Sequence, residues 1–300
     1  MPKNIVVSGA SSGFGRMTSR ALAEQGHTVF AGIRDVAGRN AEPADEAAAY
    51  ARGRRVDLRV IELDVTSAES VKNATAGILD QGGRVDVLVH NVGAMVVGPA
   101  EAFTPEQLAD LYDTNVLGAH RLNRAMLPSM RANGDGLLLW IGNAGARAGS
   151  PPYLAPYFAA KAGLDALAAN TALEVARFGI ETTIVTPGSF TRGTNHYAHA
   201  GAPADAAVAA EYELRYPQLM EQIGAKMAML EPAGIDAAVI ARLIVEVVAM
   251  DKGTRPLRVH HEPSGQGATA VDEVADRVRG EFLARLGLSD LLHPSNPEEN

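Results

Sequence analysis

Tyr157 and Lys161 are the side chains whose types and spacing point most clearly to chemistry. Residues four apart share one face of a helix, so the ammonium group would lie close to the phenol. A nearby positive charge favours the ionised phenol and lowers a pKa that is normally about 10. We therefore expect this pair to pass a proton to or from a carbonyl oxygen.

A glycine-rich turn provides a second candidate site. Residues 8–15 read Ser-Gly-Ala-Ser-Ser-Gly-Phe-Gly, between a stretch typical of a buried strand and a stretch typical of a helix. Glycine lets the backbone approach a pyrophosphate closely, and the N-terminus of the helix offers free N–H groups to the phosphates. A tight connection without a ligand is the alternative reading. The residues expected at a dinucleotide are Gly9, Ser11, Ser12, Gly13, Phe14 and Gly15.

Alternating strands and helices would position these groups. Short β-rich runs alternate with helical stretches, which predicts a doubly wound parallel sheet of the Rossmann type with helices on both faces. Strands are expected at residues 4–8, 28–33, 58–63, 85–90, 137–141 and 181–185, and helices at 13–25, 36–55, 67–80, 104–130 and 157–178.

We expect a single α/β domain over residues 1–300. Two segments interrupt the alternation. Residues 189–230 form an insertion rich in Tyr, Met and Ala, which we expect to cover a substrate cleft, and residues 261–300 form a tail with some helical character. Four side chains of the insertion are expected to line or cover that cleft, with simple surface packing as the alternative: His196, Tyr197, Tyr212 and Tyr216. The pairs His196/His199 and His260/His261 have no partner motif, so we expect no metal.

Composition narrows the function classes. The chain has 300 residues, 47% of them hydrophobic, and a formal net charge of −8, which argues against a nucleic-acid partner. It has no cysteine, which excludes disulfides and thiol nucleophiles. No apolar run is long enough to span a bilayer, and no signal peptide precedes the first strand. We expect a soluble cytoplasmic protein without a membrane partner.

Over residues 4–260 these motifs, taken together, resemble the short-chain dehydrogenase/reductase family. The turn Gly-x-x-x-Gly-x-Gly matches the family pattern, with Ser8 in place of its threonine. His90-Asn91-Val92-Gly93 resembles the family's Asn-Asn-Ala-Gly turn, with His90 and Val92 as departures. The resemblance implies that Tyr157 and Lys161 are catalytic and also bind cofactor, and that Asn115 supports a water relay. It further implies cofactor contacts at Asp64, Val65, Asn91, Gly93, Pro187, Gly188, Phe190 and Thr191.

One family residue is missing. The family places a serine about thirteen residues before the tyrosine, but that position is Ala144. With one extra residue in the loop, Asn143 takes its place, and an amide can also donate to a substrate oxygen. Ser150 is the alternative hydroxyl.

The end of the second strand bears on the choice of cofactor. NAD-preferring members of the family place an acidic residue where this chain has Ile33, and Arg34 follows. A guanidinium group suits a 2′-phosphate, so we predict NADP rather than NAD. Arg34 paired with Asp35 on the surface is the alternative, and Arg39 could join or compete.

The sequence therefore predicts an NADP(H)-dependent oxidoreductase that interconverts an alcohol and a ketone or aldehyde, with Tyr157 as the general acid/base. The apolar insertion indicates a lipophilic or aromatic substrate. Family members often pair through helices equivalent to residues 104–130 and 157–178, so we expect a homodimer or homotetramer. The alternatives are a non-catalytic dinucleotide sensor and a lyase or epimerase that uses bound cofactor.

Overall fold

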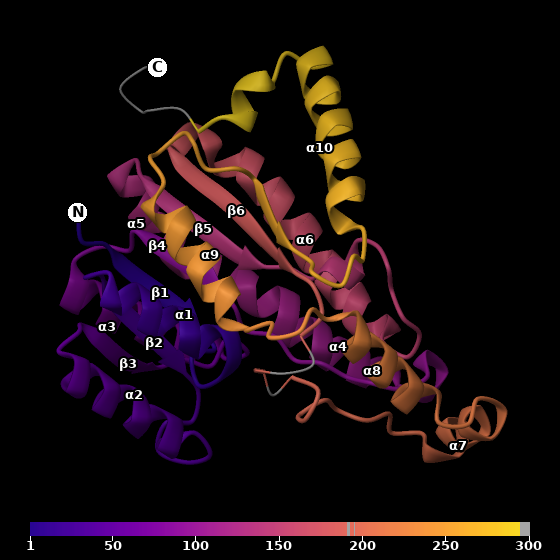
Figure 1. Ribbon diagram of the computed structural model, residues 1–300. Helices are drawn as coiled ribbons and strands as arrows, with labels where there is room; N and C mark the ends of the chain where they lie inside the picture. Colours follow the sequence, from indigo (N-terminus) through magenta and orange to yellow (C-terminus); the bar gives the residue numbers. More distant parts are fainter. Residues whose placement is uncertain (191–192, 195, 295–300) are drawn as a thin grey trace.

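The computed structural model describes residues 1–190, 193–194 and 196–294, and its centre is one parallel sheet (Figure 1). The strands lie in the order β3-β2-β1-β4-β5-β6-β7, and all neighbours are parallel. This confirms the predicted doubly wound sheet. The strands are β1 (Asn4–Ser8), β2 (Thr28–Ile33), β3 (Leu58–Glu62), β4 (Val87–His90), β5 (Gly136–Ile141), β6 (Ile180–Pro187) and β7 (Arg258–His261).

Helices cover both faces of the sheet (Figure 1). Among the described residues, no helix combines the length and apolar composition needed to cross a bilayer. The α-helices are α1 (Gly13–Glu24), α2 (Ala41–Arg54), α3 (Ala68–Gly82), α4 (Pro105–Tyr112), α5 (Gly118–Asn133), α6 (Ala155–Val175), α7 (Ala206–Arg215), α8 (Leu219–Leu230), α9 (Ala238–Ala249) and α10 (Ala268–Arg285).

Successive strand residues pack into opposite layers. Ile5 and Val7 of β1 belong to the core cluster that α1 and α9 close, whereas Val6 belongs to the cluster that α3, α5 and α6 close. Side chains along a strand point alternately to the two faces of a sheet. A sheet covered on both faces therefore needs apolar residues at consecutive positions, as β1 has.

The predicted helix over residues 104–130 is present, but it is not regular along its length. α4 begins with a capping box between Thr104 and Gln107 and ends at Tyr112, and a wider π-helical turn at Asp113–Leu117 connects it to α5. The Nδ2 group of Asn115 donates to the carbonyl of Leu111 at 2.9 Å, which helps to satisfy the backbone where the regular pattern breaks. Such turns often mark functional sites.

His90, a departure from the family pattern, is a core residue at the end of β4. Its Nε2 atom lies 2.8 Å from Oδ1 of Asn123, and its ring lies 4.1 Å from that of Trp140. Burial lowers the pKa of His90 to about 4, so the imidazole is neutral at physiological pH.

The sheet changes direction between β1 and β4. From β1 the chain proceeds outward through β2 and β3, and it then returns to β4 on the other side of β1. Ligands of doubly wound sheets bind at the carboxyl ends of the strands beside such a switch point. The segments that follow β1 and β4 are therefore where a cofactor site is expected.

Candidate active site

The turn between β1 and α1 has the close backbone approach that its glycines suggest. Gly9 and Gly13 have φ angles of +68° and +52°, in the region that favours glycine. At Gly15 a β-carbon would lie 2.3 Å from the carbonyl oxygen of Gly9 and 2.4 Å from Nδ2 of Asn91. The first turn of α1 can therefore fold back against the glycine-rich turn only without a side chain at position 15.

Asn91 and Ser8 fasten this turn to the end of β4. The Asn91 side-chain amide donates to the carbonyl oxygens of Ser8 and Gly9 at 2.9 and 3.0 Å. The Ser8 hydroxyl donates to the carbonyl of Val89 and accepts from the backbone N–H of Asn91, both at 3.0 Å. The Asn91 amide predicted to touch cofactor thus supports the turn that would hold it.

The N-terminus of α1 suits an anion. Ser12 is the N-cap residue but makes no side-chain capping bond, and the first turn carries no acidic residue. A β-carbon on Gly13 would meet nothing within 4 Å. The free N–H groups, the positive end of the helix dipole and the open space at Gly13 fit the pyrophosphate of a dinucleotide. Ser11 lies half-buried in the same turn.

Arginine side chains lie at the adenosine end of the expected site. Arg34 and Arg39 are exposed after β2, and within the described residues Arg34 forms no ion pair. Asp35 instead accepts from the backbone N–H of Arg39 at 2.9 Å, and no ion pair joins Asp35 to Arg34 in the described residues. An unpaired guanidinium group is free to meet a phosphate.

Asp64 and Val65 follow β3. Burial acts to raise the pKa of Asp64, but hydrogen bonds from the N–H and hydroxyl of Thr66 and the charges of Arg34 and Arg39 hold that pKa below its usual range. Asp64 is thus an ionised acceptor near neutral pH. The Val65 side chain belongs to the core, and its carbonyl accepts from Arg121 at 3.2 Å.

Tyr157 and Lys161 are both buried on the first turns of α6. The Lys161 ammonium donates to the carbonyl of Ile141, at the end of β5, at 2.9 Å, and burial lowers its pKa to about 8. Burial raises the pKa of the Tyr157 phenol, Tyr197 adds to this rise, and the Asn143 hydrogen bond opposes it. The sequence prediction of a lowered phenol pKa is therefore wrong in direction, because desolvation outweighs the expected help from the ammonium.

Asn115 closes the same site from the π-helical turn. Its Oδ1 atom accepts from the N–H of Ala94 at 3.2 Å, and its Nδ2 donates to the Ala94 carbonyl at 3.1 Å. A β-carbon at Gly93 would lie 3.2 Å from Asn115 Oδ1 and 3.4 Å from Lys161 Nζ. Gly93, Asn115 and Lys161 therefore form one packed group.

Two polar side chains approach the Tyr157 hydroxyl. The Nδ2 atom of Asn143 lies 3.5 Å from it, and Nε2 of His196 lies 3.4 Å from it on the segment after β6. Burial, and next the charge of Lys161, lower the pKa of His196 to about 4, so this imidazole is neutral. Ser150, the alternative to Asn143, is exposed and donates its hydroxyl to the carbonyl of Gly145.

The segment after β6 meets the glycine-rich turn. Gly188 donates its N–H to the carbonyl of His261 at 2.7 Å, directly after Pro187. The Phe190 ring stacks on His261 and meets Phe14 edge-on, with centroids 6.1 and 5.4 Å apart. Thr191, which was also predicted to touch cofactor, lies outside the described residues.

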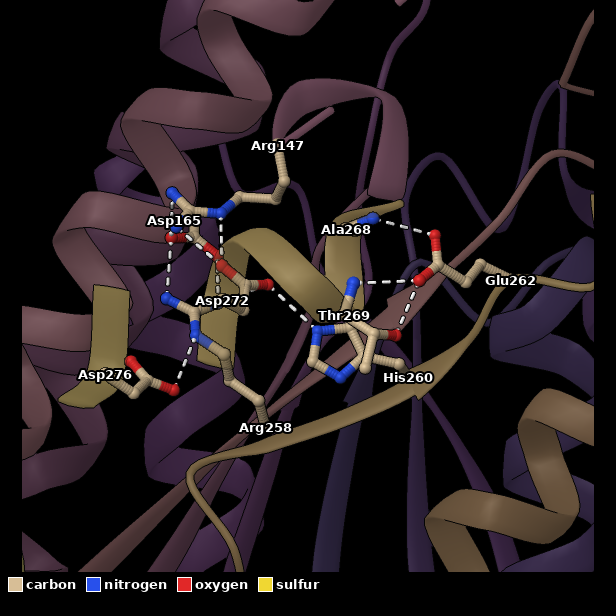
Figure 2. Close-up of polar contacts among 9 residues, drawn as sticks. All are labelled: Arg147, Asp165, Arg258, His260, Glu262, Ala268, Thr269, Asp272 and Asp276. Carbon is tan, nitrogen blue, oxygen red and sulfur yellow. Dashed lines mark hydrogen bonds and ion pairs between the residues drawn. The ribbon is translucent and has the colours of Figure 1, made fainter. Parts of the chain in front are cut away.

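A buried ionic cluster anchors the loop that carries Asn143 (Figure 2). Arg147, four residues further along, donates Nε–H to Asp272 of α10 at 2.6 Å and lies 3.3 Å from Asp165 of α6. Arg258 of β7 makes two hydrogen bonds to Asp165, at 2.6 and 2.9 Å, and His260 lies 2.9 Å from Asp272. We call these five residues the anchor cluster. Figure 2 shows them converging from the loop, α6, β7 and α10.

The sequence did not reveal the anchor cluster. Arg147 and Asp272 are 125 positions apart, and none of its members belongs to a recognisable motif. Burial acts to raise the pKa of Asp272, but the hydrogen bond from His260 and the charges of Arg258 and Arg147 hold that pKa below its usual range. The Asp272 carboxylate is only 1% exposed, so its charge depends on those partners.

Sequence comparisons identify the family to which the chain belongs. A family model described as short chain dehydrogenase matches residues 3–202. The chain is 34% identical over 192 residues to 3-ketodihydrosphingosine reductase of Bacteroides thetaiotaomicron, covering 64% of this chain and 65% of that protein. It is 32% identical over 230 residues to estradiol 17-beta-dehydrogenase 1 of Rattus norvegicus, covering 76% of this chain and 65% of that protein. The chain thus spans less than two thirds of the length of these curated relatives.

Solved structures give the same fold. A short-chain dehydrogenase from Streptomyces avermitilis is 33% identical with a TM-score of 0.70, and the match covers 95% of this chain and 98% of that one. An alcohol dehydrogenase from Thermococcus sibiricus, complexed with 5-hydroxy-NADP, is 24% identical with a TM-score of 0.68, covering 87% of this chain and 96% of that one. This second likeness supports the fold alone.

Loss of the Asp272 carboxylate should destabilise the protein. We expect Asp272→Ala to lower the free energy of unfolding by roughly 3 kcal/mol, because Arg147 and Arg258 would stay largely buried after losing a carboxylate that both approach. Urea unfolding followed by circular dichroism measures this change. Glu273→Ala is the matched control, since this exposed neighbour on α10 should change the free energy by less than about 0.5 kcal/mol. Equal effects of the two substitutions would contradict the role of the anchor cluster.

Proposed function

This chain belongs to the short-chain dehydrogenase family, and from that premise we propose that it is an NADP(H)-dependent oxidoreductase that interconverts an alcohol and a ketone or aldehyde. The observation that carries the proposal is that polar side chains from separate segments lie around one phenol. Tyr157 is buried on α6, with Asn143 at 3.5 Å from its hydroxyl and Lys161 one helical turn further on. The fit of the α1 N-terminus to a pyrophosphate supports it from the cofactor side.

In a carbonyl reduction, Tyr157 and Asn143 would have different roles at the substrate oxygen. When bound, the nicotinamide supplies the hydride to the carbonyl carbon. The raised pKa of Tyr157 keeps the phenol protonated, so it can donate its proton to the substrate oxygen. Asn143 would donate a second hydrogen bond to the same oxygen, in the place of the family serine.

Lys161 and Asn115 would support the phenol after it has lost its proton. Burial gives Lys161 a pKa of about 8, so it is still mostly protonated at pH 7 and its charge favours the phenolate. Lys161 would also bind the nicotinamide ribose. Asn115, hydrogen-bonded to both backbone groups of Ala94, would hold a water in the relay that returns a proton.

The substrate that we propose is lipophilic or aromatic. Residues 189–230 would form its cover, and the described helices of this segment, α7 and α8, have no buried residue. Leu214 and Met229 are each 83% exposed there. Two relatives, a ketodihydrosphingosine reductase and an estradiol dehydrogenase, are named for apolar compounds, which supports the same class.

The decisive experiment compares Tyr157→Phe with the parent protein. A panel of ketones and aldehydes is offered with NADPH, and its consumption is followed by absorbance. We expect turnover on at least one apolar carbonyl and a loss of about 1,000-fold in kcat in the variant, because the proton donor is gone. The Kd for NADPH should stay unchanged. Tyr50→Phe on α2 is the control and should keep full activity. Tight NADPH binding without turnover on any carbonyl would instead favour a sensor.

Asn143→Ala tests the replacement for the serine. Removing a donor to the developing oxyanion should lower kcat on the order of 100-fold and leave the Kd for NADPH unchanged. Asn170→Ala, an exposed amide on the same α6 as Tyr157, is the control. If the kinetics of Asn143→Ala match those of the parent protein, His196 becomes the candidate for this hydrogen bond.

Arg34→Ala tests the choice of cofactor. A guanidinium–phosphate hydrogen bond contributes about 1.5–3 kcal/mol, so the KM for NADPH should rise roughly 10- to 100-fold while that for NADH changes little. Arg52→Ala in the last turn of α2 is the control. If Arg34→Ala raises both KM values equally, Arg34 does not recognise the 2′-phosphate. The double variant with Arg39→Ala shows whether the second arginine compensates.

A further inference from the structure

Helix α10 carries its apolar and charged residues in an unusual arrangement. Its exposed side includes Val271, Val274, Val278 and Phe282, which are 41 to 53% exposed, and Leu286 just beyond its end is 55% exposed. Its buried residues are Ala268, Asp272 and Leu283. A surface helix normally turns its apolar stripe inward. Here a buried carboxylate lies inside and a stripe of five large apolar side chains faces outward, and we call these five residues the outer stripe.

The anchor cluster fixes this orientation. Asp272 is held by Arg147 and His260, and Asp276 lies 3.4 Å from Nε of Arg258 (Figure 2). Glu262 also accepts from the backbone N–H groups of Ala268 and Thr269, at the start of the helix. Rotation of α10 to bury the outer stripe would break these contacts and leave charges buried without partners.

We propose that the outer stripe is a self-association surface, on which α10 of a second copy of this chain packs antiparallel around a two-fold axis close to Val278. The stripe reads nearly the same in both directions. Val274 and Phe282 lie four residues to either side of Val278, and Val271 and Leu286 lie seven and eight residues away. An isologous interface needs such self-complementarity, because each side chain must meet its counterpart on the same surface.

The charges beside the stripe are also self-complementary. Arg277 and Glu281 lie on one flank of the helix and, in this chain, pair with each other at 3.0 Å while about 60% exposed. With the two-fold axis midway between Val278 and Arg279, Arg277 of one copy lies one residue from the level of Glu281 of the other copy and three residues from the level of its Arg277. The reverse contact follows by symmetry. Opposite charges along the edge of a helical interface set partner and orientation.

A second copy fits this surface better than a lipid surface does. Amphipathic helices that bind membranes typically carry Lys and Arg on the polar face. Helix α10 carries four carboxylates against three guanidinium groups, and the whole chain has a net charge of −8. Both features oppose binding to anionic lipids. Figure 1 shows α10 at the outer margin of the molecule, where a second copy can approach.

Cysteine cross-linking tests the proposal directly, because the chain has no cysteine of its own. We compare Val278→Cys, at the axis, with Glu273→Cys, which is exposed on the same helix away from the outer stripe. At micromolar protein under mild oxidation, Val278→Cys should form a disulfide-linked dimer roughly 100-fold faster, because association raises the effective thiol concentration to the millimolar range. Equal rates would overturn the proposal, even if the protein is oligomeric through another face.

Charge exchange provides an independent measurement in the Val278→Cys background. Arg277→Glu should slow cross-linking by about tenfold or more, because it places two carboxylates opposite each other. Adding Glu281→Arg to the same chain should restore the rate. Failure of the double variant to recover, with native circular dichroism, would overturn the antiparallel arrangement. Slow cross-linking together with sedimentation on phosphatidylcholine–phosphatidylserine vesicles would overturn the proposal in favour of a lipid surface. None of these outcomes depends on enzymatic turnover.

Discussion

Side-chain hydrogen bonds between the ends of β1 and β4 shape the site more than any other contact. At a switch point the chain leaves two neighbouring parallel strands in opposite directions. The backbone between the two strand ends therefore has no regular hydrogen-bond partner. Ser8 and Asn91 provide those partners with a hydroxyl and an amide. The glycine-rich turn can then lie against the first turn of α1 with no side chain between them at Gly15. The open N-terminus of α1 depends on that geometry.

Burial is the second constraint, and it governs the electrostatics of the reacting groups. Tyr157, Lys161 and Asn115 are each 5% exposed or less. Removal from water raises the pKa of the phenol and lowers those of the lysine and of His196, so each group moves toward its neutral form. The buried phenol is therefore protonated and able to donate a proton. A bound cofactor that favours the charged forms of these side chains would oppose the pKa shifts that burial causes.

Much of the fold could be predicted from the sequence because local patterns carry it. Consecutive apolar residues in β1 signal a sheet covered on both faces, and the spacing of Tyr157 and Lys161 places them together on α6. The π-helical turn at Asn115 escaped prediction, because one extra residue per turn leaves no periodic signal. The link from Arg147 to Asp272 also escaped, since it joins segments far apart in the chain. The direction in which the pKa of Tyr157 shifts depends on burial, and the spacing of residues in the sequence does not reveal burial.

The neutral imidazole within the sheet has a consequence for acid tolerance. With a pKa of about 4 in the folded protein and about 6.5 in an unfolded chain, His90 takes up a proton on unfolding throughout the interval between these values. Unfolding therefore becomes easier as the solution is acidified from pH 6.5 toward 4, and the penalty saturates below that range. This loss of stability begins above the pH range in which most carboxylates titrate, so His90 is an early contributor to acid unfolding.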